Sequence, residues 1–169
     1  MNFVTRLLLP LAPVVALAAP VHAQSLRIPL EGTPAIEVAK QAGWTEKYDE
    51  YGNLTLFADD GSGGLLFRTI ETGANETLPD NAAVAELILS AAESKPYSRR
   101  VATDFAGGSA EAFHSTMSVD GPVVEIVVVI RKLDERHLAI GITMIPLSTK
   151  AEGRATVMAQ FALARIANR

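Results

Sequence analysis

Aliphatic and β-branched residues dominate the chain from residue 122 to residue 146, with one short polar break at residues 134–136. Residues of this kind favour β-strands. The break has the length of a hairpin loop, so the pattern predicts two antiparallel strands joined by a tight turn. Side chains alternate across a strand, and both faces of the first strand are apolar in its middle. We therefore expect this hairpin inside a sheet, covered on both sides or flanked by neighbouring strands.

The second strand of this hairpin has a bulky face and a small one. The bulky face consists of Leu138, Ile140, Ile142 and Met144. The small face carries Ala139 and Gly141 near its centre, which leaves room for a neighbouring element. We expect the last helix of the chain to pack closely against this small face.

Two helices are predicted in the first half of the chain. Thr33 and Pro34 suit the cap and the first position of a short helix, and Gly43 suits its C-terminal end. A second helix is predicted over residues 81–94, capped by Asp80 or Asn81. Its apolar stripe at helical spacing consists of Val84, Leu87, Ile88 and Ala91.

A third helix is predicted at the end of the chain, after a cap at Ser148 or Thr149. Its expected apolar face consists of Met158, Phe161, Ala162 and Ile166. The residues expected to face solvent are Arg154, Gln160, Arg165 and Arg169.

Four further strands are predicted, at residues 54–58, 65–71, 97–105 and 110–119. We interpret the glycine-rich residues 59–64 as a hairpin tip, because they lack the spacing of a phosphate-binding or calcium-binding loop. The predicted order is helix, two strands, helix, four strands, helix. Consecutive strands with short turns favour an antiparallel sheet of about six strands packed against helices, which is an α+β fold.

The first 23 residues have the pattern of a secretory signal peptide. Arg6 precedes an apolar run over residues 7–19, and Val21 and Ala23 suit the cleavage site. Prolines interrupt this run, and it is shorter than the roughly 20 residues of a membrane-spanning helix. We therefore expect a signal peptide at 1–23 and a single α+β domain at 24–169. The expected location is periplasmic or secreted, in a bacterium, with no stable membrane span after cleavage.

Composition excludes several classes of function. The chain has no cysteine, so disulfides, a thiolate nucleophile and cysteine metal ligands are ruled out. The formal net charge is -4 and no run of basic residues occurs, so neither nucleic acid nor an anionic membrane surface is an expected partner. Hydrophobic residues make up 49% of the chain, which is enough for a substantial core.

The order of these segments is similar to that of a known superfamily. Gly43 and Trp44 lead through a polar segment into a hairpin, a helix near residues 81–94 precedes four strands, and an amphipathic helix closes the chain. Over residues 43–168 this resembles the PsbP-like α+β superfamily, which includes the bacterial DcrB-like periplasmic proteins. The resemblance implies a non-catalytic accessory or binding module. Many bacterial relatives are lipoproteins, and this chain has no cysteine to acylate.

Two histidines of the mature chain are candidates for chemistry. His114 and His137 fall on different predicted strands and could approach each other. A metal site would need a third ligand, with Glu125 or Glu135 as candidates. Nothing in the spacing requires such a site, so no metal and no cofactor are predicted. No Gly-x-Ser-x-Gly motif of a serine hydrolase is present either.

Three arginines are candidates for binding an anion or an acidic partner. Arg131 could share a face of the sheet with either Arg99 or Arg100. The neighbouring arginines point to opposite faces of one strand, so only one of them can join Arg131.

Three hypotheses of function follow from these patterns. The first is an exported, non-enzymatic accessory module that binds an envelope protein. The second is a periplasmic hydrolase or metal-dependent enzyme that uses His114 and His137 with nearby carboxylates. The third is a small-ligand site between the sheet and the last helix, which a cavity beside Gly141 would favour and dense packing by Met158 and Phe161 would disfavour.

Overall fold

The computed structural model describes residues 24–29, 34–118 and 120–167. In that part of the chain, ten strands and two helices form an α+β fold with antiparallel sheets. The predicted fold class is confirmed. The predicted signal peptide, residues 1–23, and the predicted helix cap Thr33 lie outside the described residues.

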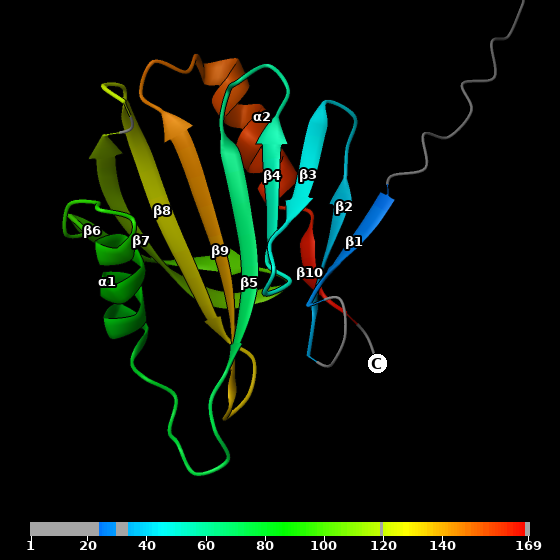
Figure 1. Ribbon diagram of the computed structural model, residues 1–169, viewed down its shortest axis with the longest axis vertical. Coiled ribbons are helices and arrows are strands. Elements are labelled where there is room, and N and C mark those ends of the chain that lie inside the picture. The colour runs from blue at the N-terminus through cyan, green and yellow to red at the C-terminus, as the bar shows by residue number, and fades with distance from the viewer. Residues whose placement is uncertain (1–23, 30–33, 119, 168–169) are drawn as a thin grey trace, which may run out of the picture.

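A large antiparallel sheet occupies the centre of the molecule, with seven strands in the order β3-β4-β5-β9-β8-β7-β6 (Figure 1). Its strands are β3 Trp44–Tyr48, β4 Leu54–Ala58, β5 Gly64–Glu71, β6 Arg99–Phe105, β7 Gly108–Ser118, β8 Val123–Lys132 and β9 His137–Pro146. The predicted hairpin is β8–β9, and it lies between β7 and β5. Its central position in the sheet is confirmed.

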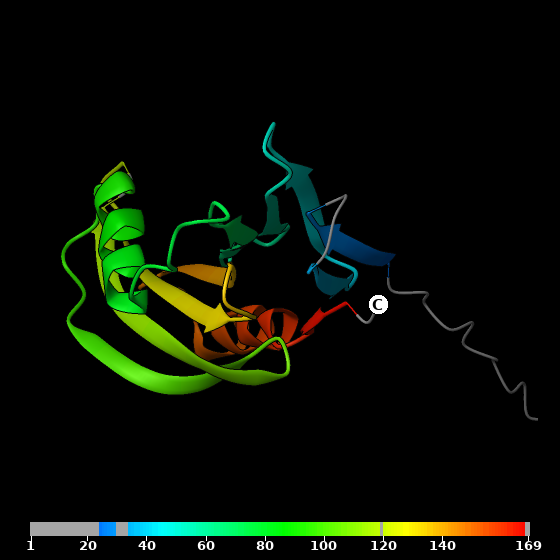
Figure 2. The same cartoon turned by 90° about the horizontal axis from the view of Figure 1, so that it is seen from below.

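The two faces of this sheet are covered by different elements. Helix α1 (Asn81–Ala91) lies on one face, over β7 and β8, whereas α2 (Ala151–Phe161) lies on the other, over β9 and β5 (Figure 2). The alternation predicted for β8 follows this division. Ile126, Val128 and Ile130 are buried with α1, while Val129 is buried in the cluster that contains α2.

A small second sheet corrects the predicted first helix. It has the order β1-β2-β10, with β1 at Gln24–Ile28, β2 at Ile36–Lys40 and β10 at Ala164–Ile166. Residues 36–40 are therefore a strand, and Gly43 has its positive φ of 82° in the turn before β3, not at a helix end. Ile36 and Val38 alternate with Glu37, and both are fully buried between β1 and β10. This alternation of buried and partly exposed side chains is typical of a strand, and it determines the structure here despite the Thr-Pro capping signal.

The last helix is shorter than predicted. Helix α2 ends at Phe161, and the chain then forms β10, where Ile166 pairs with Ile36 of β2. Its N-cap is Lys150, not Ser148 or Thr149. The Thr149 hydroxyl instead donates a hydrogen bond of 3.0 Å to the carbonyl of Ser62. Residues 164–166 therefore pair with the free edge of β2, although the helical pattern assigned them to the last helix.

Helix α1 begins as predicted, with the Asp80 carboxylate accepting from the backbone N–H of Ala82 at 3.0 Å. Its buried stripe is different, because Val84, Ala85 and Leu89 are buried and Leu87 is 72% exposed. Burial follows the position of the helix over β7 and β8, which leaves Leu87 beside uncovered sheet.

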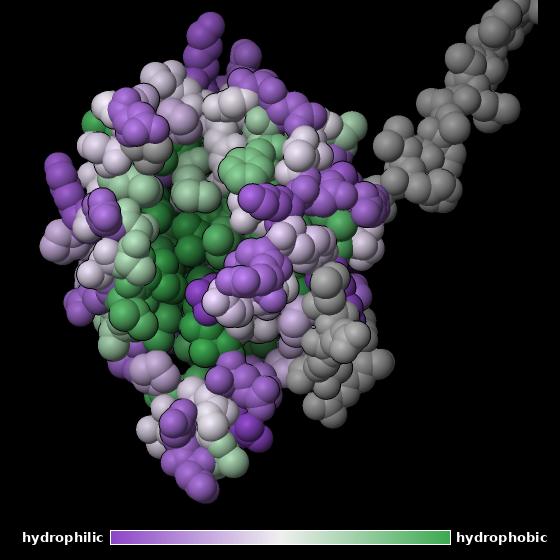
Figure 3. All heavy atoms as spheres, in the orientation of Figure 1, coloured by the Kyte–Doolittle hydropathy of each residue, from purple (hydrophilic) through white to green (hydrophobic). Residues whose placement is uncertain are grey.

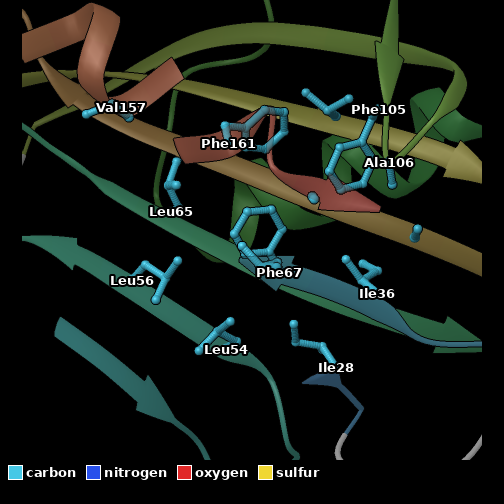
Figure 4. Close-up of a cluster of buried hydrophobic side chains, with 14 of the residues drawn as sticks. Ile28, Ile36, Leu54, Leu56, Leu65, Phe67, Phe105, Ala106, Val157 and Phe161 are labelled. Carbon is cyan, nitrogen blue, oxygen red and sulfur yellow. The ribbon is translucent and has the colours of Figure 1, made fainter. Parts of the chain in front are cut away.

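The close approach predicted at Gly141 is confirmed. A Cβ atom on Gly141 would lie 2.6 Å from Cε2 of Phe161 and 2.8 Å from Cζ of Phe105. Phe161 stacks on Phe67 and on Phe105, with ring centroids 5.6 and 5.1 Å apart (Figure 4). The absence of a side chain at Gly141 allows this cluster of three phenylalanines to hold α2 on the sheet.

Candidate functional site

A cavity of about 310 Å³ lies between α2 and strands β6 to β9, and we call it the α2 pocket. It begins where the phenylalanine cluster ends. Its floor includes Val127 and Val129 of β8, and Met158 and Phe161 of α2 line the opposite side. Thr143 of β9 also lines it. Phe161 and Phe105 thus fill the space directly beside Gly141. The cavity lies further along β9, at Thr143 and Ile145.

One wall of the α2 pocket is a chain of four polar side chains, the polar quartet. Arg154 Nη1 donates to Glu125 Oε2 at 2.6 Å, and Glu125 Oε1 lies 3.7 Å from His114 Nδ1. On its other side, His114 Nε2 lies 3.1 Å from Arg99 Nη2. A guanidinium can only donate, so Nε2 accepts and the proton of the neutral ring sits on Nδ1, facing Glu125.

The surroundings fix the charges of the quartet. Burial of the ring and the neighbouring Arg99 lower the pKa of His114 below its usual value, although Glu125 opposes them. The hydrogen bond from Arg154 lowers the pKa of Glu125. At neutral pH, His114 is therefore neutral, and the charges of Glu125 and Arg154 balance each other.

Strand register and helix spacing bring the quartet together. Arg99 of β6 is opposite His114 of β7, which is opposite Val127 of β8. Arg154 was expected to face solvent and instead lines the pocket. Its position four residues before Met158 places both on one side of α2, and this spacing is the signal that could have identified it.

Gln160 was also expected to face solvent, and that prediction is wrong. Its side chain is fully buried. It donates to the carbonyl of Ala39 at 2.9 Å and accepts from the backbone N–H of Gln41 at 3.0 Å. Gln160 thus ties α2 to the chain that joins the two sheets.

The structure does not bring the two candidate histidines together. His114 is opposite Val127, which pairs with Thr143, six residues along β9 from His137. This separation is about 20 Å along the strand. His137 Nδ1 contacts Asp134 of the hairpin turn at 2.8 Å. Within the described residues, no group of three or more His, Asp or Glu side chains could hold a metal ion.

The three candidate arginines do not converge either. Arg99 and Arg131 share the α2 face, but Arg131 donates to the backbone carbonyls of Phe105 and Ala106 and so holds the β6–β7 turn. Arg100 lies on the α1 face, where it forms a 2.6 Å ion pair with Glu111. Arg99 alone of the three belongs to the polar quartet.

A second hollow, the α1 groove, lies on the opposite face of the sheet. It has a volume of about 480 Å³ and runs between α1 and the part of the sheet that α1 leaves uncovered. Figure 3 shows hydrophobic side chains gathered in this hollow. Its lining includes Leu66, Arg68, Ile70, Leu87, Met117, Ile142 and Met144. The Nε atom of Arg68 is buried without a hydrogen-bond partner.

Comparison with solved structures defines the class of fold. The protein CyanoP, the cyanobacterial PsbP of Synechocystis sp. PCC 6803, matches with a TM-score of 0.61 and 10% identity, over 92% of this chain and 100% of that one. A protein of Bacteroides thetaiotaomicron VPI-5482 matches at 0.52 and 12% identity, over 79% of this chain. The match spans only 46% of the Bacteroides chain. The chain therefore has an α+β fold like that of the PsbP protein CyanoP, and at the level of the fold the resemblance inferred from the order of its segments is confirmed.

Other comparisons add context without a functional assignment. LpqN, a Mycobacterium tuberculosis protein involved in cell envelope biogenesis, has a TM-score of 0.48 and 12% identity, over 86% of this chain and 91% of that one. No protein-family model matches the sequence, and no curated protein matches it. Among the described residues, no helix is long and apolar enough to cross a membrane.

Proposed function

We propose that this protein is an exported, non-enzymatic accessory module of the bacterial envelope, periplasmic or secreted, that binds another protein through the α1 groove. The observation that carries this proposal is an open apolar groove that contains a buried and unpaired guanidinium nitrogen. The PsbP-like fold supports an accessory role, and the pattern of residues 1–23 supports export.

The incomplete cover of the sheet indicates the shape of the partner segment. Helix α1 covers β7 and β8, while Leu66 and Ile142 on the neighbouring strands line the open groove. A helix laid beside α1 would complete this layer at the usual spacing of ~8–10 Å between helix axes. Recognition of an amphipathic helix in a groove is a common mode of peptide binding.

Arg68 indicates the chemistry of that helix. A buried donor without an acceptor costs about 1–3 kcal/mol. Once the Arg68 side chain turns toward the groove, a carboxylate on the partner helix could pair with its guanidinium and remove this cost, within an otherwise apolar contact. The proposed occupant is therefore an envelope-protein helix with one apolar face that carries a single Asp or Glu.

The enzyme alternative has less support from the geometry. It required His114 and His137 to act together, and the two lie at different ends of the sheet. Each of them contacts its own carboxylate, Glu125 or Asp134.

Site-specific photo-crosslinking in cells tests the proposal. A crosslinker at Leu87, which is 72% exposed in the groove, should capture one envelope protein. The matched control is Leu147, another exposed leucine, which lies outside the groove and should not capture it. Mass spectrometry of the adduct should map the contact to a helix with an acidic residue on its apolar face.

Charge exchange makes the test specific. Arg68→Glu should abolish the Leu87 adduct, and replacing the partner's acidic residue by arginine should restore it. Equal labelling from both leucines would overturn the proposal. It would also be overturned if the occupant were a second copy of this chain or its own residues 1–23.

A further inference from the structure

The α2 pocket has features of a ligand site that the α1 groove lacks. It lies on the opposite face of the sheet and combines apolar walls with a structured polar wall. Its volume of about 310 Å³ is at the lower end of the usual range for small-molecule sites, roughly 300–1,000 Å³.

The walls differ in how firmly they are held. Phe161 is fixed by stacking on Phe67 and Phe105, so one end of the pocket has a defined shape. Met158 is 49% exposed at the opposite margin, and methionine side chains adapt readily to what they contact. The apolar part of a ligand would thus meet a rigid wall at Phe161 and an adaptable one at Met158.

The polar wall determines which head group suits the site. Glu125 and Arg154 form an internally balanced pair, and the ring of His114 is neutral. The other charged groups here, Arg99 of the quartet and Asp104 of the pocket lining, are exposed to water. A charged ligand head would therefore lose its hydration without finding a buried, uncompensated opposite charge. An uncharged group that both donates and accepts can bond to Glu125 and to a remaining N–H of Arg154 at no such cost.

We infer that the α2 pocket binds a small, uncharged ligand with a compact apolar body and a single hydroxyl or carboxamide group. The apolar body packs on Val127 and Val129, and the polar group contacts the Glu125–Arg154 pair. This site is independent of the proposed protein-binding groove.

Four probes with the same ring and different head groups test the inference. They are phenylacetamide, 2-phenylethanol, phenylacetate and 2-phenylethylamine, each titrated into the mature domain and followed by two-dimensional NMR. The amide and the alcohol should shift resonances of pocket residues and should bind about tenfold more tightly than either ion. No binding of any probe at about 10 mM, or tighter binding of an ion, would overturn the inference.

Substitutions in the ion pair should change the preference in opposite directions. Glu125→Gln leaves Arg154 uncompensated, so phenylacetate should become the preferred probe. Arg154→Met leaves Glu125 uncompensated, so the amine should become preferred. If the ion pair were purely structural, either substitution would lower the affinity for all four probes without changing their order. That result would also reject the inference.

A matched control exists on the opposite face. Arg100 and Glu111 form an ion pair with the same 2.6 Å separation on neighbouring strands, outside the pocket. Glu111→Gln should leave the wild-type order of the probes unchanged. A changed order in this variant would show that the selectivity does not arise in the α2 pocket. Photo-crosslinking at Leu87 reports on the α1 groove alone, so failure of either proposal is recognisable separately.

Discussion

The two faces of the seven-stranded sheet differ in how completely other elements cover them. On one face, α2 and the small sheet together cover the strands, and the phenylalanine cluster closes the contact around Gly141. On the other face, α1 alone covers β7 and β8, and hydrophobic side chains of β5 and β9 line an open groove. The closed face is thus organised for stability and a small cavity. The half-open face retains apolar surface, which is typical of interaction sites.

The largest difference between the faces should appear at two glycines. Gly141→Ala places a methyl group against Phe161 and Phe105, and we expect a loss of about 3 kcal/mol in the free energy of unfolding. Gly64 is the matched control on the other face, because its added Cβ would meet neighbours only at 3.5 Å or more. Gly64→Ala should change stability by less than about 0.5 kcal/mol in urea denaturation. Equal costs at the two positions would contradict the close packing of α2.

The second test concerns the attachment of α2 to the small sheet. Gln160→Leu removes both hydrogen bonds to the backbone of Ala39 and Gln41, and we expect a loss of about 2 kcal/mol. Thr156→Ala on the same helix is the control, since its hydroxyl bonds only to Glu152 within the helix. If Gln160→Leu were as stable as Thr156→Ala, the two hydrogen bonds of Gln160 would contribute nothing to the attachment of α2.

Much of the closed face could be predicted from the sequence because its signals are local. The alternation in residues 123–146 assigns side chains to faces without knowledge of the neighbours, and Gly141 stands out on the small face. β10 has no comparable signal, since its three residues are a strand only because β2 offers a free edge. In the same way, Leu87 is exposed because of the position of α1 on the sheet. The spacing of apolar residues along the helix contains no information about that position.

The candidate site was only partly predictable for the same reason. Arg99, His114 and Glu125 come from three strands, and their contact depends on register across β6, β7 and β8. Sequence spacing named His114 and Glu125 as candidates but paired His114 with His137, which lies far along the sheet. Arg154 joins them through the placement of α2, a long-range consequence of the phenylalanine cluster.

The third test exploits the unpaired nitrogen of the half-open face. Arg68→Met keeps an unbranched side chain and removes the buried donor, so the free protein should gain about 1 kcal/mol in stability. The same substitution should weaken the partner complex, because the proposed salt bridge is lost. Arg100→Met is the control, and it should destabilise the protein because Arg100 is already paired with Glu111. A loss of stability in Arg68→Met would mean that Arg68 supports the fold rather than a partner.

The smallest expected effect is a pH dependence that belongs to the closed face. The pKa of His114 is lowered in the folded protein, so the unfolded chain binds the proton more readily. Stability should therefore fall as pH decreases through the unfolded value of about 6.5 towards the folded pKa. Urea denaturation at several pH values should show this decline in the wild type and a flatter profile in His114→Gln. Arg99→Gln should flatten it partially, because Arg99 contributes to the lowered pKa. If the slope of stability against pH were unchanged in both variants, the decline would arise from titration of groups other than His114.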